Sequence, residues 1–383
     1  MIPYGRQIIS EEDIAAVEAV MRSDFLTQGP VLPRFEQAVA DRVGARCAVA
    51  VNSATSALHI ACLALDLIPG DLLWTSPITF VASANCGRYC GANIDFVDID
   101  PDTFNICPDA LEAKLVAADR KGKLPKVIVA VHMCGQSPDM LRISELARAY
   151  GVKIIEDASH AIGAEYLGSP VGKCTYSDIT VFSFHPVKII TAAEGGIALT
   201  NDAELATRMG RLRSHGITRD PALMTHESDG PWYYQQLELG WNYRMTEIQA
   251  ALGLSQVDQL EAFITRRCEL AYAYDSALAE LPLYKPGRQA HAASSWHLYV
   301  IRLCNAASHG RTFEALRAGG IGVNLHYIPV HLQPYYRAQG FALGDFPMAE
   351  DYYSRAISIP LYAGLTDEEQ SKVVCTLTKV LAG

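Results

Sequence analysis

The sequence predicts an α/β fold, with a large domain built on a mostly parallel sheet and a smaller C-terminal α/β domain. Between about residues 35 and 215, short β-rich apolar runs alternate with helix-length amphipathic segments, a pattern typical of a parallel sheet with helices on both faces. The 383 residues are enough for one large domain and one smaller domain. We place the large domain, with its N-terminal arm, at residues 1–245 and the small domain at residues 246–383.

Short apolar runs give the expected strands of the large domain. They are four or five residues long and are separated by helix-length segments, so they fit strands that are buried in a sheet. Ligands of such sheets bind beyond the carboxyl ends of the strands, which makes the residues at those ends candidate site residues. The runs are Ala48–Val51, Leu72–Thr75, Ile94–Val97, Val127–Val131, Val152–Ile155, Ile179–Phe182 and Ile197–Thr200.

Helical periodicity marks several further segments. Ser10–Met21 predicts the first helix, because a capping-box pattern precedes apolar residues at helical spacing. Pro138–Tyr150 predicts a helix inside the large domain. After a polar, turn-rich loop at Asp220–Gly230, a helical stretch at Thr246–Leu260 continues into Glu261–Leu281. Residues 282–383 then alternate strands and helices, as expected of a second α/β domain.

Bulk composition argues against several classes of function. The formal net charge is −10 and no run of lysines and arginines offsets it, so we expect no nucleic-acid partner. No apolar stretch approaches the roughly 18 residues that span a bilayer, and the N-terminus lacks an apolar signal core. The ten cysteines are scattered without a C-x-x-C pair or a metal-binding spacing. We therefore expect a cytoplasmic protein with no membrane partner and no bound metal.

Lys188 is the most informative residue of the chain. A lone lysine is usually a solvated surface residue, but this one lies in an apolar loop between two expected strands. Burial would lower the pKa of its amine, which suits a group that forms a Schiff base and moves protons. Gly195 and Gly196 follow, and they predict a tight turn or a close backbone approach into the next strand.

Asp157 follows an apolar strand and precedes Lys188 by some thirty residues. Alone, such an aspartate could simply cap the following helix. Together, a lysine amine and a strand-end acid are what a pyridoxal 5'-phosphate (PLP) enzyme needs. The amine holds the cofactor aldehyde, and the acid keeps the pyridine nitrogen protonated so that the ring can act as an electron sink. The sequence therefore predicts a PLP site at Lys188 and Asp157.

Other candidate residues have both a structural and a functional interpretation. Just past the strand that ends at Val51, a helix start with the hydroxyls of Ser53 and Thr55 could hold a phosphate, or Ser53 could be an ordinary N-cap. Phe80 could stack on a flat cofactor ring or pack in the core. His160 could reach the ring hydroxyl of the cofactor or be a satisfied structural histidine.

These motifs resemble those of the DegT/DnrJ/EryC1/StrS sugar aminotransferases, PLP enzymes that act on nucleotide-linked keto sugars. Within the family, the resemblance is greatest to the branch that aminates C4 of UDP-sugars in pseudaminic acid biosynthesis. Ala54 and His160 stand where many relatives carry a glycine and a glutamine. A deoxygenating subgroup has a histidine in place of the lysine, so Lys188 argues against that chemistry here. The matching segments are Leu26–Gly29, Asn52–Leu58, Ser76–Asn85, Asp157–Tyr166, Val181–Gly196, Arg213–Gly216, Gly240–Gln256 and His326–His331.

The resemblance implies a fold type I PLP-dependent transferase, aspartate-aminotransferase-like, that works as a homodimer with shared active sites. Lys188 would bind the cofactor and later move a proton, and Asp157 would pair with the pyridinium nitrogen. By itself Asn242 would be a turn residue before a helix, but the resemblance has it reach the phosphate bound by the neighbouring subunit. The further implied cofactor contacts are Ala54, Thr55 and Ser183 at the phosphate, Phe80 on the ring and His160 near the ring oxygen.

Substrate contacts are implied for the N-terminal arm and for two loop segments. Tyr4 has an alternative interpretation as interface packing, and His326 with His331 could be ordinary loop histidines. The residues implied to touch the sugar nucleotide are Tyr4, Asp24, Phe25, Leu26, Thr27, His326, Tyr327, Ile328 and Pro329.

The implied reaction moves the amino group of L-glutamate, which leaves as 2-oxoglutarate, to the C4 ketone of a UDP-linked 4-keto-6-deoxy-N-acetylhexosamine. Two alternatives stay open. One is the same chemistry on another nucleotide keto sugar, with a C3 ketone or a dTDP link, which the motifs do not separate. The other is a non-catalytic PLP-binding sensor or scaffold, against which the intact set of lysine, acid and phosphate-site residues argues.

Overall fold

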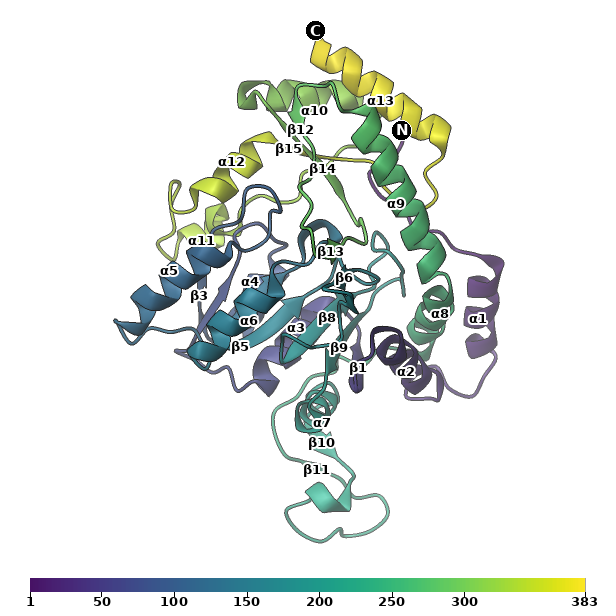
Figure 1. The fold of residues 1–383 in the computed structure, drawn as a ribbon. Coiled ribbons are helices and arrows are strands. Elements are labelled where there is room, and N and C mark those ends of the chain that lie inside the picture. Colours follow the sequence, from purple (N-terminus) through teal and green to yellow (C-terminus); the bar gives the residue numbers. More distant parts are fainter. Residues whose placement is uncertain (383) are drawn as a thin grey trace.

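The computed structural model describes residues 1–382 and confirms the predicted α/β fold (Figure 1). Its centre is a seven-stranded sheet in the order β1-β9-β8-β5-β4-β2-β3. β9 runs antiparallel to both of its neighbours, and the other neighbouring pairs are parallel, so every strand except β9 points toward the same edge. The strands are β1 (Cys47–Val51), β2 (Leu72–Thr75), β3 (Asn93–Phe96), β4 (Val127–Val131), β5 (Lys153–Asp157), β8 (Ile179–Ser183) and β9 (Gly196–Thr200).

The helices around this sheet are α1 (Glu11–Met21), α2 (Val31–Val43), α3 (Ala54–Ala64), α4 (Ala82–Tyr89), α5 (Pro108–Asp119), α6 (Met140–Ala149), α7 (Ala203–Leu212) and α8 (Glu247–Asp258). Alternate residues of the strands face different cores. Val127 and Val129 of β4 pack in a core with α3, α4 and α7, whereas Ile128 and Ala130 pack with α5 and α6. Because both faces are buried, the strands are continuous apolar runs, and this is why the sequence located them within one or two residues.

The first helix begins at the predicted capping box. Ser10 Oγ accepts a hydrogen bond from the amide of Asp13, and the Asp13 carboxylate accepts one from the amide of Ser10. The long helical stretch after residue 245 is divided at Gln259 into α8 and α9 (Leu260–Ala277). The sequence placed the passage from one helical segment to the next between Leu260 and Glu261, close to this break.

Helix α8 lies against α1 and α2, and with α2 it shares a core that reaches β1, β8 and β9. The Glu247 carboxylate accepts hydrogen bonds from the amides of Val31 and Leu32, at the start of α2. Helix α2 has no side-chain cap of its own, so Glu247 supplies one from α8. The domain boundary at residues 245 and 246 stays a prediction.

A second, smaller layer follows α9. Its antiparallel sheet has the order β12-β14-β15 and packs against α9, α10 and α13. The start of the chain joins this layer, since Ile2 is buried there and pairs with Ile321, and the amide of Leu361 donates to Tyr4 O. The elements are β12 (Leu283–Tyr284), β14 (Tyr299–Leu303), α10 (His309–Ala318), α11 (Pro334–Arg337), α12 (Pro347–Arg355), β15 (Ala356–Ile359) and α13 (Asp367–Ala382).

Two small sheets have no counterpart in the sequence-based prediction. In one, β13 (Ala292–Ala293) pairs with β6 (Glu165–Tyr166) and so joins the chain after α9 to the large sheet region, and β7 (Ser169–Pro170) completes it. In the other, β10 (Ile217–Thr218) and β11 (Gln235–Gln236) form a hairpin that extends away from the body (Figure 1). Strands of two residues are too short to show a periodicity. No helix within residues 1–382 is both long and apolar enough to cross a membrane.

Candidate active site

A cavity of about 580 Å³ lies at the edge of the sheet where β4, β5 and β8 end and where α3 begins. Parallel strands bring their carboxyl ends to one edge, so residues far apart in sequence meet there. The predicted site residues that line the cavity are Tyr4, Ala54, Thr55, Phe80, Asp157, His160, Ser183, Lys188, His326 and Tyr327.

Lys188 lies on the loop between β8 and β9 and lines the cavity. The loop is closed on itself: the amide of Phe184 donates to Gly195 O, and Thr191 Oγ1 donates to Phe184 O. The side chain is partly exposed where it meets the cavity, and protein surrounds it elsewhere. Burial lowers the pKa of Lys188 from 10.5 to about 8, against the opposing charge of Asp157. An amine with such a pKa can gain or lose a proton near neutral pH.

Asp157 is the last residue of β5, and its carboxylate is held on both oxygens. Its Oδ2 accepts from Ser83 Oγ at 2.6 Å, and its Oδ1 accepts from Ser159 Oγ at 2.5 Å and from the Ser159 amide at 3.2 Å. The residue is 5% exposed, so its interactions are made in a largely dry environment. A buried carboxylate on the cavity wall is a suitable partner for a cationic ring nitrogen.

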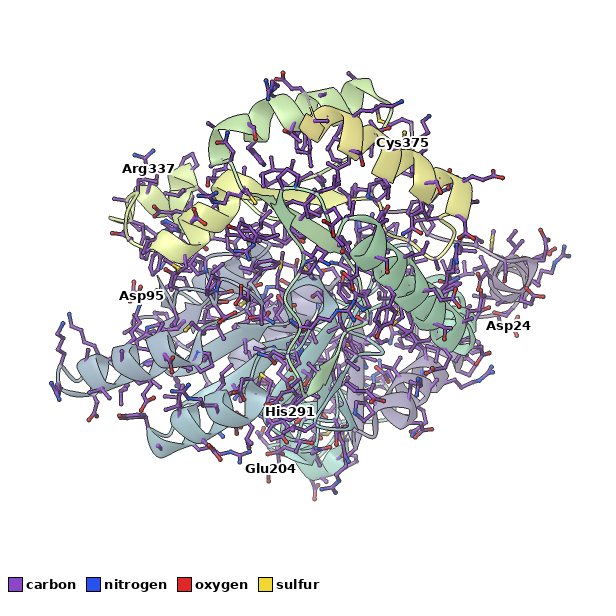
Figure 2. All side chains as sticks on the ribbon, turned by 45° about the horizontal axis from the view of Figure 1, so that its top comes forward. Asp24, Asp95, Glu204, His291, Arg337 and Cys375 are labelled. Carbon is purple, nitrogen blue, oxygen red and sulfur yellow. The ribbon has the colours of Figure 1, made fainter. Side chains whose placement is uncertain are left out.

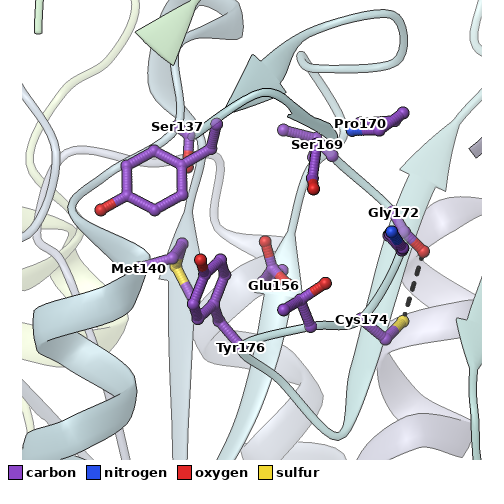
Figure 3. Close-up of a pocket in the computed structure, with 12 residues that line it drawn as sticks. Ser137, Met140, Glu156, Ser169, Pro170, Gly172, Cys174 and Tyr176 are labelled. Atoms are coloured by element: carbon purple, nitrogen blue, oxygen red, sulfur yellow. Dashed lines mark hydrogen bonds between the residues drawn. The ribbon is translucent and has the colours of Figure 1, made fainter. Parts of the chain in front are cut away.

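Glu156, the preceding residue, serves the opposite face of the sheet. Its Oε2 lies 2.8 Å from His132 Nε2, and its Oε1 accepts from Ser177 Oγ at 2.5 Å. Burial alone would raise the pKa of Glu156, but the hydrogen bonds and charge of its partners, His132 first, bring it below its ordinary value. Glu156 lines a separate cavity of about 20 Å³, and Figure 3 shows its side chain between Tyr176 and Ser169. Of these two adjacent acids, only Asp157 therefore lines the cavity that contains Lys188.

The start of α3 forms a candidate phosphate cradle. Ser53 is the N-cap, since its Oγ accepts from the amide of Ser56 at 3.1 Å. The amides of Ala54 and Thr55 have no hydrogen-bond partner within residues 1–382, and both residues line the cavity. Free amides at a helix N-terminus bind phosphate. A Cβ atom at Gly196 would lie 2.4 Å from Ala54 N, so glycine there permits the predicted close approach.

Phe80 belongs to the cavity and not to the core. Its side chain is 57% exposed, and its ring centroid lies 6.0 Å from that of Tyr327 across a tilt of 54°. The ring is therefore free to receive a flat ligand, as the functional interpretation requires.

Buried histidines line the same cavity as Lys188. His160 Nε2 lies 3.2 Å from Tyr327 Oη, while its Nδ1 is buried and has no partner in the described part of the chain. Burial, with the charges of Lys188 and His326, holds the pKa of His160 well below its ordinary value. The ring of His297 lies 4.3 Å from that of His160, and burial also lowers the pKa of His297 well below its ordinary value. These imidazoles stay neutral, so they do not add to the positive charge near the amine.

The N-terminal arm and the His326 segment meet at the cavity. The rings of Tyr4 and His326 have centroids 5.1 Å apart, and His326 Nδ1 lies 2.8 Å from Ser358 Oγ. Burial, with the charge of Lys188, lowers the pKa of His326 to about 3. Of the predicted neighbours, Tyr327 lines the cavity, whereas the exposed Ile328 and the buried Pro329 do not.

The Asp24–Thr27 segment and Asn242 lie outside the cavity of their own chain. Asp24, Phe25, Leu26 and Thr27 are all exposed, and Figure 2 shows Asp24 at the outer edge of the molecule. Thr27 pairs with Thr246 in an isolated bridge. Asn242 is also exposed and pairs with Ser214. Their predicted roles in binding substrate and cofactor stay predictions.

Several residues of the cavity wall have no sequence pattern that marks them as site residues. His297 lies outside every strand and helix, and Thr79 and Ser159 are small polar residues that only their position next to Phe80 and Asp157 could have marked. Ser53, a candidate phosphate contact in the sequence, also lines the cavity. The cavity residues that were not predicted are Leu58, Thr79, Ala82, Val131, Ser159, His185, Val187, Glu194, His297, Asn324 and Leu325.

The residues present fit PLP. Free helix-start amides suit its phosphate, the buried carboxylate of Asp157 suits its ring nitrogen, the open ring of Phe80 suits its face, and the amine of Lys188 suits its aldehyde. The fold and this donor set define a PLP-dependent enzyme of fold type I.

Comparisons of sequence identify the family. The profile of the DegT/DnrJ/EryC1/StrS aminotransferase family matches residues 7–378. The chain belongs to this family and is a PLP-dependent sugar aminotransferase. The spore coat polysaccharide biosynthesis protein SpsC of Bacillus subtilis is 37% identical over 388 residues, which cover 100% of this chain and 97% of that protein.

Solved structures agree in fold over the whole chain. PseC of Helicobacter pylori, an aminotransferase involved in the biosynthesis of pseudoaminic acid, superposes with a TM-score of 0.91 at 32% identity, covering 100% of this chain and 99% of that one. The PLP form of the putative sugar aminotransferase Spr1654 from Streptococcus pneumoniae superposes with a TM-score of 0.90 at 29% identity, covering 100% and 98%.

Proposed function

We propose that this chain transfers the amino group of L-glutamate to the C4 ketone of a UDP-linked 4-keto-6-deoxy-N-acetylhexosamine, a precursor of pseudaminic acid. The observation that carries the chemistry is the meeting of Lys188 and Asp157 in one cavity, with the lysine pKa lowered to about 8. The likeness to PseC supports the sugar, and so do Ala54 and His160, because many relatives carry a glycine and a glutamine at those two positions.

Bound PLP carries the amino group between donor and acceptor and serves as an electron sink. The residues of the chain bind it, orient it and move protons. Lys188 accepts a proton at Nζ from the donor carbon and later returns one at the sugar, since a base with a pKa near the working pH does both steps well. Asp157 holds the ring-nitrogen proton through a charge-assisted hydrogen bond, and the free amides of Ala54 and Thr55 hold the phosphate.

The first experiment is an absorbance titration of the purified protein with L-glutamate. The cofactor band should change to that of the aminated cofactor as 2-oxoglutarate appears, and Lys188→Ala should abolish steady-state turnover while the protein stays folded. A protein that shows no cofactor band even after PLP is added would refute the site. A protein that holds PLP but turns over no keto sugar would favour the sensor alternative.

The acceptor is then tested with a panel of keto sugars. We expect the UDP-linked C4 ketone to give the highest kcat/KM, with C3 ketones and dTDP-linked sugars well below it. Preference for either of those would keep the aminotransferase chemistry and replace the proposed sugar.

We also propose that the enzyme is a homodimer in which Asn242 of each chain completes the site of the other. The exposure of Asn242 outside its own cavity supports this arrangement. Mixing inactive Lys188→Ala with weakened Asn242→Ala chains should restore about a quarter of wild-type activity, because each mixed dimer then has one intact site. If both residues act within one chain, mixing will restore nothing.

A further inference from the structure

The carboxylate of Asp157 has one acceptor position left over. A carboxylate offers about four lone-pair positions, two on each oxygen. Oδ1 already accepts from the amide and the hydroxyl of Ser159, whereas Oδ2 accepts from Ser83 Oγ alone, at 2.6 Å. The open position that could serve a further donor therefore lies on Oδ2, the oxygen to which Ser83 is bound.

Ser83 is itself held by a second hydroxyl. Thr79 Oγ1 lies 2.7 Å from Ser83 Oγ. Because Ser83 gives its one hydroxyl proton to Asp157, Thr79 must donate to Ser83, and the three groups form a directed chain. Ser83 and Thr79 are 0% and 2% exposed, so water does not compete for these bonds.

The same chain ties the acid to the aromatic wall of the cavity. Thr79 and Ser83 lie on either side of Phe80, at the start of α4, and Ser83 is 74 positions away from Asp157 in sequence. A hydroxyl chain thus links the turn that presents the Phe80 ring to the carboxylate at the end of β5. A displacement of that turn would move the acid and the ring together.

We propose that Ser83, backed by Thr79, is a positioning residue that aims the open lone pair of Asp157 Oδ2 at the ring nitrogen of PLP. The inference rests on the proposed role of Asp157 and adds Ser83 to that machinery. Loss of the Ser83 hydroxyl leaves Oδ2 free to rotate away and leaves Thr79 without its acceptor. The protonated fraction of the ring nitrogen then falls, although Lys188 and the phosphate site are intact.

The test is a double-mutant cycle on the donor half-reaction. Ser83→Ala should slow single-turnover reaction with L-glutamate by about tenfold to a hundredfold, the range of one hydrogen bond to a charged group. In an Asp157→Asn background the same change should have little further effect, because the charge that it positions is gone. Equal effects in both backgrounds would overturn the proposal. Ser144→Ala is the matched control, since Ser144 Oγ is buried and unpartnered within residues 1–382, and it should leave the rate unchanged.

A second readout does not depend on turnover. The ¹⁵N chemical shift of the ring nitrogen of ¹⁵N-labelled PLP reports its protonation directly. Ser83→Ala should move that shift toward the Asp157→Asn value, and Thr79→Val should move it less, in the same direction. Thr79→Val also serves if Ser83→Ala does not fold. If Asp157→Asn itself matches the wild type, the proposed function of Asp157 fails, whereas a changed Asp157→Asn with an unchanged Ser83→Ala refutes only the positioning role.

Discussion

Replacing Lys188 with methionine should stabilise the cofactor-free protein while it abolishes activity. Methionine is close to lysine in length and carries no charge. The difference between the ordinary lysine pKa of 10.5 and the lowered value of about 8 corresponds to about 3 kcal/mol for keeping the charged amine in the folded protein. Since the amine keeps some access to water through the cavity, we expect the free energy of unfolding of Lys188→Met to exceed that of the wild type by about 2–3 kcal/mol at neutral pH.

The pH dependence identifies the cause. Below pH 8 both the folded and the unfolded chain carry the proton, so the destabilisation is fully present. Between pH 8 and pH 10.5 only the unfolded chain keeps it, so wild-type stability rises with pH relative to the variant. The advantage of Lys188→Met should therefore shrink to about 1 kcal/mol or less near pH 10.

The assay is urea unfolding of the cofactor-free proteins at pH 7, 8.5 and 10, followed by circular dichroism. Lys121→Met is the control, because Lys121 is exposed, and it should show no comparable change with pH. A Lys188→Met protein no more stable than the wild type at pH 7, or equally stabilised at pH 7 and pH 10, would refute the reasoning.

Three further changes test other parts of the structure. Gly196→Ala should weaken PLP binding by about tenfold or more, because its Cβ would lie 2.4 Å from Ala54 N and displace the start of α3. Equilibrium dialysis measures the affinity. Gly210→Ala is the control, because a Cβ there meets open space, and it should leave the affinity unchanged. Glu247→Ala should lower the free energy of unfolding by about 1–3 kcal/mol, since two amides at the start of α2 lose their acceptor, and a loss below about 0.5 kcal/mol in urea would contradict that cap. Asp157→Asn should reduce turnover strongly at unchanged stability, and normal steady-state kinetics would exclude its role.

The chemistry-bearing residues at strand ends were predictable because buried parallel strands are continuous apolar runs. Once those runs were located, Asp157 and Lys188 had to come to the same edge of the sheet. Glu156 shows the limit of that reasoning. It lies only one residue before Asp157, but the alternation of side chains along a strand turns it to the opposite face, where it meets His132.

Contacts between distant segments were not predictable. Ser83 meets Asp157 across 74 positions, and His297 meets His160 through a segment with neither helical nor strand periodicity. A single hydroxyl or imidazole has no local pattern that marks its partner. Asn242 differs again, because its exposure outside its own cavity means that a second chain is needed to test its role.

The pairing of Ile2 with Ile321 joins the start of the chain to a segment that is synthesised much later. At roughly 5–20 residues per second, a ribosome needs on the order of 15–65 s to travel from one partner to the other. The contact between the rings of Tyr4 and His326 forms at least as late. The hydrogen bond from the Leu361 amide to the Tyr4 carbonyl forms later still. The large sheet can be complete while one wall of its cavity is still being translated. A nascent chain arrested before residue 320 should therefore contain Lys188 and Asp157 in folded surroundings, yet leave its first residues open to a protease.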